Sequence, residues 1–391
     1  PATIYNSAAR GQVDSEAAGL ALFAIYCLLR SDDGAAERPS GWVVAAWLAI
    51  AYSLLIKPQA AVVLPLMAAF VFVDPARRRA RLIASGIGIG AAILLALVLV
   101  EPFHPSNPVE AFSWLFGRYS YGSNVYPYNS VNAFNLWAIR GSFWQPDTGP
   151  ISAFGTFSLG PQYVWGIILV AAAVVLVLWR YVQERTPRAL LEGCAVATIA
   201  FFVLATRMHE RYLFDGLLFT IVCVPFARRY LWGAVALSVV LFANLQYSLQ
   251  YLYAMVNHVP GVNAQNLWGA GTTAFALVSV GTFFWLGYQF LGGETAPAPA
   301  AAGPEEARTP AVAAPAGLKT RNWFDPAEGL AAMRWPLDYA VAAGFGAVNF
   351  VLSFVGYWWP PDKVFDEIYF ARAGEEYLQN LRIYENTHPP L

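Results

Sequence analysis

The sequence predicts an all-α, polytopic integral membrane protein with about ten transmembrane helices, and three observations support this. Of the 391 residues, 58% are hydrophobic and 13% are charged, whereas soluble domains carry about a quarter charged residues. The apolar residues gather in long runs, and most arginines fall in alternate connections between these runs. The formal net charge is only -1, so no basic excess indicates a nucleic acid partner.

About ten runs are long enough, or nearly so, for a helix across the membrane, which needs roughly 20 apolar residues. They are 16–30, 41–56, 58–73, 82–101, 163–181, 189–206, 213–226, 229–247, 268–291 and 337–357. Several are short, and the stretch 41–73 allows a different division around Lys57 and Pro58. We expect helices throughout, with amphipathic helices in the external connections.

The arginines test this division, because one span more or fewer would move every later connection to the opposite side. The runs place these arginines on one side, predicted to be cytoplasmic: Arg30, Arg38, Arg77, Arg78, Arg79, Arg81, Arg180, Arg185, Arg188, Arg228 and Arg229. The other side, predicted to be external, receives Lys57, the connection 102–162, the segment 206–214 and the tail 358–391. The motif-like stretches therefore lie together on the external face.

The segment 292–334 is rich in alanine and proline with scattered charges, a composition that cannot bury a core and behaves as an extended linker. We expect it to be cytoplasmic and to separate a transmembrane body, 1–291, from a second module. That module, 335–391, starts with its first helix and first external loop. The chain has no initiator Met, and its last residues stop as a motif begins. We expect both modules to be parts of a longer protein.

Asp366 and Glu367 stand side by side shortly after the last apolar run and a Trp-Trp-Pro-Pro turn. The residues that follow have apolar positions at three- and four-residue steps, which indicates an amphipathic helix on the membrane surface. The helix dipole favours acidic groups in a first turn, so the pair has a purely structural interpretation. A carboxylate beside the membrane is also suited to act as general base on an acceptor hydroxyl.

The motif FDE, which contains this pair, the motif ENTHPPL at the end of the chain, and RWPLDY before the span resemble the start of the protein O-mannosyltransferase family. Its members are membrane enzymes of the GT-C class that use dolichyl-phosphate mannose. The resemblance implies that Asp366 matches the catalytic Asp and Glu367 its partner. It also implies that Glu385 and His388 match a second motif of the pocket. One more residue separates Glu385 from His388 here than in many members of the family.

Four stretches of the body, IYNSAARGQVDS, SLLIKPQAAVVLPL, YNSVNAFNLW and TRMHERYLF, resemble bacterial polytopic mannosyltransferases in their order and spacing. They are more distantly similar to the dolichyl-phosphate-glucose-dependent glucosyltransferases. The resemblance implies a GT-C-like body in which the region around Asp14 lines the site. It also implies that the main catalytic carboxylate lies upstream of the residues in this chain. Arg10 departs from the pattern, since relatives usually have an aromatic residue there.

The stretch TRMHERYLF places Arg207, His209 and Arg211 beside an external membrane edge. Arginine offers a fork of donors that matches a phosphate, and histidine adds a further contact. Glu210 stands between them, where it is suited to orient one arginine. The alternative is structural, because arginines at a membrane interface ordinarily extend their charged heads into the water.

Lys57 lies between two apolar runs and is followed by the helix-breaking Pro58 and by Gln59. A lysine in such a place needs a partner or a water-filled cavity, and a phosphate or a carboxylate is a natural partner. The alternative is a lysine that merely marks a short external turn. Asp14, at the mouth of the first run, is likewise either a helix N-cap or part of the site.

The two resemblances imply transfer of a sugar, most simply mannose, from a polyprenyl-phosphate donor to a protein or lipid-linked acceptor on the external face of the inner (plasma) membrane, and the placement of the motif-like stretches on one side supports this. Asp366 takes the acceptor proton, and Glu367 positions the acceptor. Arg207, Arg211 and Lys57 stabilise the leaving phosphate. No metal is demanded, because no cluster of oxygen ligands has a recognisable spacing. The alternative is a non-catalytic membrane scaffold, or a transporter with Lys57 on its path.

Overall fold

The computed structural model describes residues 14–33, 38–100, 107–141, 143–153, 157–256 and 267–292. The predicted linker beyond its first residue, the last apolar run and the external tail lie outside these residues. The predictions for Asp366, Glu367, Glu385 and His388 therefore also lie outside the described part of the chain.

Each apolar run that the structure describes forms a helix, so the predicted helical character of these runs is confirmed. The helices are Asp14–Arg30 (α2), Gly41–Ile56 (α3), Leu64–Val73 (α4), Arg78–Val100 (α5), Gln162–Glu184 (α7), Pro187–Leu204 (α8), Phe214–Cys223 (α9), Arg228–Val256 (α10) and Ala270–Leu291 (α11). Short 3-10 helices adjoin them: Ser31–Asp33 (η2), Pro58–Val63 (η3), Leu136–Ala138 (η5), Glu210–Leu213 (η6) and Val224–Phe226 (η7).

Within the described residues, five helices are long and apolar enough to cross a membrane: α5, α7, α8, α10 and α11. The remaining helices of the apolar runs are shorter, with 17 residues in α2 and 16 in α3. Large apolar side chains stay uncovered on α5 and α7, where Leu94 and Ile167 are 62% and 64% exposed. A surface of this kind suits lipid rather than water. The protein is thus mostly helical and membrane-embedded in character.

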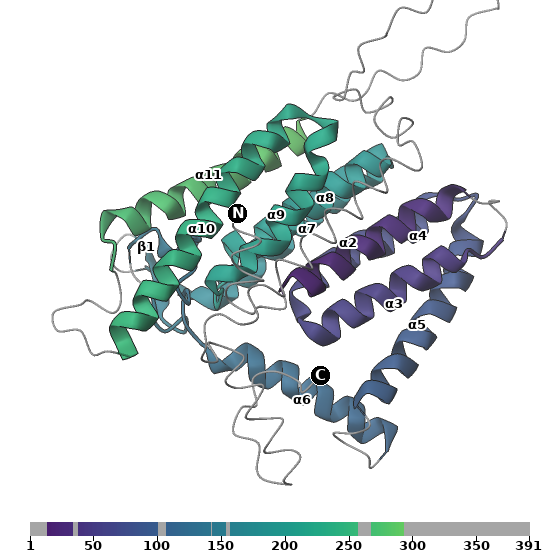
Figure 1. The fold of residues 1–391 in the computed structure, drawn as a ribbon, viewed down its shortest axis with the longest axis horizontal. Helices are drawn as coiled ribbons and strands as arrows, with labels where there is room; N and C mark the ends of the chain where they lie inside the picture. Colours follow the sequence, from purple (N-terminus) through teal and green to yellow (C-terminus); the bar gives the residue numbers. More distant parts are fainter. Residues whose placement is uncertain are drawn as a thin grey trace, which may run out of the picture.

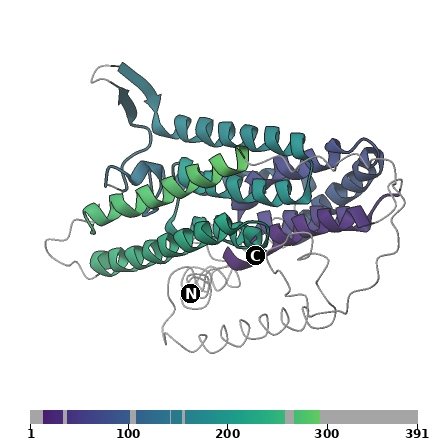
Figure 2. The ribbon, with the colours of Figure 1, turned by 90° about the horizontal axis from the view of Figure 1, so that it is seen from above.

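Helix α8 lies inside the bundle. Of its most apolar 18-residue stretch, 83% is buried, against 17% in α7. Figures 1 and 2 show α8 and α9 between the group α2 to α5, drawn in purple and blue, and the green pair α10 and α11. A Cβ atom on Gly216 of α9 would lie 2.9 Å from Ile199 Cγ1 of α8. Only glycine permits so close an approach of these two helices.

The helix ends follow local chemistry. Helix α3 stops before Pro58, which has no N–H to donate, and Lys57 takes up an extended conformation at φ -150° and ψ 128°. Helix α8 begins after Thr186, whose hydroxyl accepts a hydrogen bond from its first turn, with Pro187 at the first helical position. Helix α7 ends at Arg185 in a left-handed conformation, φ 55° and ψ 28°, where glycine is the usual residue.

The connection 102–162, which the sequence predicts to be external, contains a helix and a hairpin among its described residues. Helix α6 (Pro108–Val125) begins after Asn107, whose side chain caps its first turn, and Figure 1 shows it lying across one end of α2 to α5. Strands β1 (Pro150–Ala153) and β2 (Phe157–Pro161) then pair in antiparallel fashion. This hairpin departs from the all-α prediction, because strands this short leave no long apolar run in the sequence.

The turns that carry the arginines meet at one end of the bundle. Arg81, near the start of α5, forms an ion pair with Asp32 after α2. Arg229, at the start of α10, lies 3.4 Å from Glu192 near the start of α8. Asp32, Arg81 and Arg185 also line one cavity, so these turns lie together, whereas their cytoplasmic location stays a prediction. We call this side the arginine-rich end.

Candidate functional site

A buried ion pair joins the start of α2 to the end of α3. Lys57 Nζ lies 2.8 Å from Asp14 Oδ1, and the two side chains are 7% and 0% exposed. The chain leaves α3 at Lys57 because Pro58 cannot continue the helix, and the lysine head reaches α2. Lys57 is therefore no marker of an exposed turn, and that interpretation of the sequence is wrong.

A second basic side chain approaches the same carboxylate. Arg211 lies in η6, between α8 and α9, and its Nε is 3.9 Å from Asp14 Oδ2. Its Nη1 is 3.3 Å from Glu210 Oε1, and the Arg211 and Glu210 side chains are only 10% and 4% exposed. Asp14 thus lies between Lys57 and Arg211. Glu210 contacts the arginine that follows it, as the sequence predicted.

Asp215 completes this arrangement, and the sequence prediction did not include it. It lies in the first turn of α9, is 4% exposed, and interacts electrostatically with Asp14 and Lys57. Its Oδ1 is buried without a hydrogen-bond partner among the described residues. A signal was present, because an ionisable side chain inside an apolar run marks a functional position by default. We call Asp14, Lys57, Glu210, Arg211 and Asp215 the charge cluster.

Gln59 provides a second buried hydrogen-bond acceptor without a partner among the described residues, close in the chain to Lys57 of the charge cluster. It follows Lys57 by two residues, is 6% exposed, and its Oε1 is buried without a hydrogen-bond partner in the described part of the chain. Buried polar atoms are almost always bonded, so each exception calls for an explanation such as strain, a bound water or a ligand group. Gln59 Oε1 and Asp215 Oδ1 therefore both require hydrogen-bond donors.

Aromatic rings adjoin the charge cluster at η6. The ring of His209 is centred 4.9 Å from that of Tyr126 and 5.1 Å from that of Tyr212. Its Nδ1 lies 4.0 Å from Glu210 Oε2, so His209 is joined to the cluster through this carboxylate. Burial raises the pKa of the Tyr212 hydroxyl to about 12. The hydroxyl therefore stays neutral near pH 7 and keeps its proton to donate.

Arg207 lies apart from the charge cluster. Its Nε is 2.7 Å from Oδ2 of the fully buried Asp147, and its Nη1 donates to Asn124 Oδ1 at the end of α6 over 2.8 Å. Its own backbone has a φ of 63°, in the left-handed region that residues other than glycine seldom adopt. Arg207 therefore fastens α6 to the segment before the hairpin. The structure does not bring it together with Lys57 and Arg211, with which the sequence grouped it.

Comparison with known proteins assigns no family to this geometry. No protein-family model matches the chain, and no curated protein matches it significantly. Across the described residues, no group of three or more His, Cys, Asp or Glu side chains is arranged to hold a metal ion. The function has to be argued from the side chains of the charge cluster themselves.

The charge cluster contains two cations, Lys57 and Arg211, and three carboxylates, and each cation already contacts a carboxylate. A lysine ammonium has three donors; one of those on Lys57 reaches Asp14, and the others have no partner within the described residues. The Arg211 guanidinium presents a planar fork of donors that matches two phosphate oxygens. Such contacts are stronger away from bulk water. A phosphate that binds here would share these two cations with Asp14 and Glu210, and hydroxyl groups of the same ligand would donate to the unsatisfied acceptors.

Proposed function

We propose that the chain is a membrane glycosyltransferase of the GT-C type, which takes a sugar, most simply mannose, from a polyprenyl-phosphate donor. One observation carries the proposal: Lys57 and Arg211 share the buried carboxylate of Asp14, on segments with unsatisfied buried acceptors. A polyprenyl-phosphate sugar has the matching groups. Its phosphate suits the two cations, and its sugar hydroxyls suit Gln59 Oε1 and Asp215 Oδ1.

In the proposed reaction, the oxygen of an acceptor hydroxyl bonds to the anomeric carbon, and the bond from that carbon to the phosphate oxygen breaks. The electron pair of the broken bond stays on the polyprenyl phosphate, whose charge Lys57 and Arg211 stabilise as it leaves. The hydroxyl proton passes to a carboxylate. We assign this role to Asp366, with Glu367 as its positioning partner, both outside the described residues.

The proposal includes a GT-C architecture with ten membrane spans, the last of them 337–357. The five long apolar helices support it, as do the shorter helices that occupy the other predicted runs within the described residues. The charge cluster then faces the outside of the inner membrane, opposite the arginine-rich end. A protein or lipid-linked acceptor would approach from that face. Glu385 and His388 would contribute to the pocket of the second module.

A transporter is the second candidate, because a buried ion pair between helices also marks ion-coupled pathways. Asp14 and Lys57 form such a pair. In that case the pair would separate and re-form as the carried solute passes, and no covalent bond of a sugar donor would break. A scaffold without catalysis would need neither event.

The test is transfer of radiolabelled mannose from polyprenyl phosphate in membranes that contain the full-length protein. Arg211→Gln removes a cation of the charge cluster. We expect it to lower the transfer rate by about 100-fold, the usual loss when a donor to the developing charge is removed. Arg79→Gln is the matched control, because Arg79 is an exposed arginine at the opposite end. It should leave the rate unchanged.

Asp366→Asn reports on the second module in the same assay. Loss of transfer in Asp366→Asn alone would assign the activity to the second module rather than to the body. Loss in both Asp366→Asn and Arg211→Gln would show that the residues of the two modules act together. Suppose that the wild type transfers no polyprenyl-phosphate sugar, and that vesicles take up a solute in a way that depends on Arg211. This result would contradict the glycosyltransferase proposal and support the transporter.

A further inference from the structure

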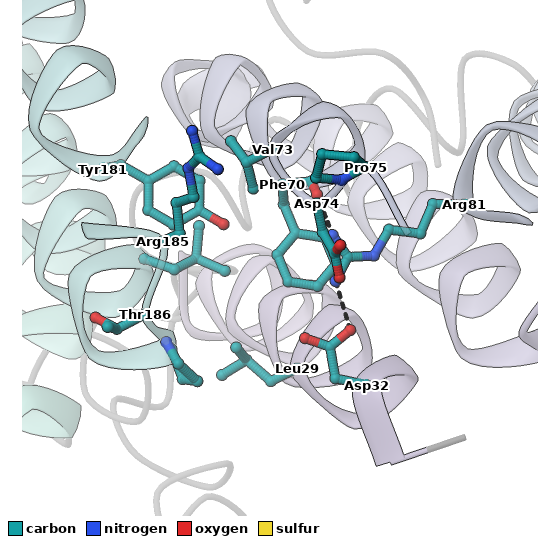
Figure 3. Close-up of a pocket in the computed structure, with 12 residues that line it drawn as sticks. Leu29, Asp32, Phe70, Val73, Asp74, Pro75, Arg81, Tyr181, Arg185 and Thr186 are labelled. Carbon is teal, nitrogen blue, oxygen red and sulfur yellow. Dashed lines mark hydrogen bonds and ion pairs between the residues drawn. The ribbon is translucent and has the colours of Figure 1, made fainter. Parts of the chain in front are cut away.

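A cavity of about 210 Å³ lies at the arginine-rich end, between the ends of α2, α4 and α7 and the starts of α5 and α8. Figure 3 shows the side chains that line it. Leu29 lines this cavity, and Asp14 of the charge cluster begins the same helix. At 1.5 Å per residue the two lie about 22 Å apart along α2. The cavity is therefore distinct from the charge cluster, and the proposed reaction does not use it.

One wall of the cavity carries two carboxylates. Asp32 follows α2 and Asp74 follows α4, and their side chains are 39% and 37% exposed. Arg81 binds Asp32, and its guanidinium lies 3.9 Å from the centre of the Phe70 ring. Arg77 approaches the two carboxylates at 3.9 and 3.6 Å. Because each carboxylate keeps more than a third of its surface, oxygen lone pairs are left for a further donor.

The facing wall carries Arg185, which Figure 3 shows beside Tyr181. Its Nε donates to the Val182 carbonyl oxygen over 2.9 Å, and its terminal nitrogens have no partner in the described part of the chain. Its φ of 55° places an arginine at a helix end where glycine or asparagine is usual. The first turn of α8 follows directly and adds partial positive charge to this wall.

We propose that this cavity binds the headgroup of an aminophospholipid, with the phosphate at Arg185 and the ammonium at Asp32 and Asp74. Arg77 and Arg81 offset the two carboxylate charges, but the exposed carboxylate oxygens still accept from an ammonium while Arg185 on the facing wall donates to the phosphate, which matches a zwitterion. A volume of about 210 Å³ is smaller than the roughly 300–1,000 Å³ of pockets that take drug-sized ligands. The cavity therefore suits a headgroup rather than a nucleotide.

The surroundings of the cavity favour a lipid over a soluble zwitterion. Leu82 and Ile83 of α5, together with Trp179 and Val182 of α7, are large apolar side chains that stay exposed. They belong to the two membrane-length helices that border the cavity. Acyl chains can cover this apolar surface while the headgroup enters the cavity between the charged walls.

The test uses the full-length protein in detergent micelles doped with phosphatidylethanolamine, and native mass spectrometry measures the lipid that stays bound. Arg185→Asn removes the charge but keeps a residue that tolerates the left-handed conformation, so the fold is preserved. We expect about tenfold weaker retention of the lipid, the effect of one lost charge-assisted contact. Arg79→Gln, an exposed arginine at the same end, is the matched control and should retain the lipid.

Two further ligands identify the source of the headgroup. Phosphatidylglycerol lacks the ammonium, so the wild type should retain less of it, and Asp74→Asn should reduce this preference. Displacement of phosphatidylethanolamine by an equal concentration of soluble phosphoethanolamine would overturn the lipid assignment in favour of a soluble zwitterion. Unchanged retention of phosphatidylethanolamine by Arg185→Asn would overturn the proposed site. An equal loss of lipid from Arg79→Gln would also overturn it, because general surface charge would then explain the binding.

Discussion

Both ends of the helical bundle contain buried charges, since Glu192 and Arg81 at the arginine-rich end are 3% and 6% exposed, but the carboxylates nearest the two candidate sites differ. At one end, Asp14, Lys57 and Arg211 are almost fully buried. At the arginine-rich end, Asp32 and Asp74 keep more than a third of their surface exposed. Exposed ion pairs contribute little to stability, whereas a buried pair is costly to form and costly to break. Stability alone is therefore a poor reason for the buried charges around Asp14, and the proposed function gives another reason for them.

Loss of the lysine in the charge cluster should have the largest effect on stability. Lys57→Met leaves the carboxylate of Asp14 buried and deprives it of its contact at 2.8 Å. We expect the free energy of unfolding to fall by about 3–5 kcal/mol, the range for a buried charge left without its partner. Unfolding in mixed detergent micelles, followed by circular dichroism, measures the change.

The double variant Asp14→Asn with Lys57→Met distinguishes the effect of the buried charge on stability from the effect of lost packing. It should recover most of the lost free energy, because no buried charge is then left uncompensated. If the double variant is as unstable as Lys57→Met, the destabilisation comes from lost packing, and the contrast between the two ends loses its electrostatic basis.

The next largest effect is expected at the opposite end, from Arg81→Met. Arg81 is the most deeply buried member of the ion pairs with Asp32, with its own side chain 6% exposed, and it also donates to the Phe70 carbonyl oxygen. We expect a loss of about 1.5–3 kcal/mol, the value for hydrogen bonds to charged groups. The same unfolding measurement applies. A loss as large as that of Lys57→Met would show that the two ends do not differ.

Asp215→Asn should separate function from stability. Its Oδ1 lacks a hydrogen-bond partner within the described residues, so removal of the charge should change the free energy of unfolding by less than about 1 kcal/mol. Sugar transfer should nevertheless fall by about tenfold, because a hydroxyl of the donor loses a carboxylate acceptor. Parallel unfolding and label-transfer measurements check this. Unchanged transfer would remove Asp215 from the proposed site.

The smallest effect is expected for Arg77→Gln at the arginine-rich end. The Arg77 side chain is 24% exposed and its partner Asp32 is 39% exposed. Exposed pairs of this kind contribute about 0–1 kcal/mol, and this small loss should vanish at high salt because the charges are then screened. Unfolding at low and high ionic strength tests both points. A loss that persists at high salt would indicate a more buried role.

The sequence predicted the helices well because hydropathy is a local property. The runs 16–30 to 268–291 each became helices, and the arginine pattern placed their connections correctly at the arginine-rich end. The hairpin of β1 and β2 was missed, since its strands of four and five residues carry no comparable signal. The terminal predictions, Asp366 and Glu367 among them, stay predictions.

The candidate site was predicted only in part. Lys57 was found because a lone charge between apolar runs stands out, but its partner Asp14 lies 43 residues away, and only tertiary packing joins them. Asp215 was missed because the average hydropathy of its run conceals a single acid. Arg207 was grouped with Arg211 by proximity in sequence, whereas a left-handed backbone turn sends the two side chains to different partners.

The enclosure of α8 has a consequence for biosynthesis. This helix is less apolar than α5 and α7 and carries Glu192 near its start, yet during insertion it must leave the aqueous translocation channel before its neighbours surround it. Only Arg185 and Thr186 separate it from α7. We therefore expect the two helices to enter the bilayer as one hairpin, with the strongly apolar α7 providing most of the driving force for both.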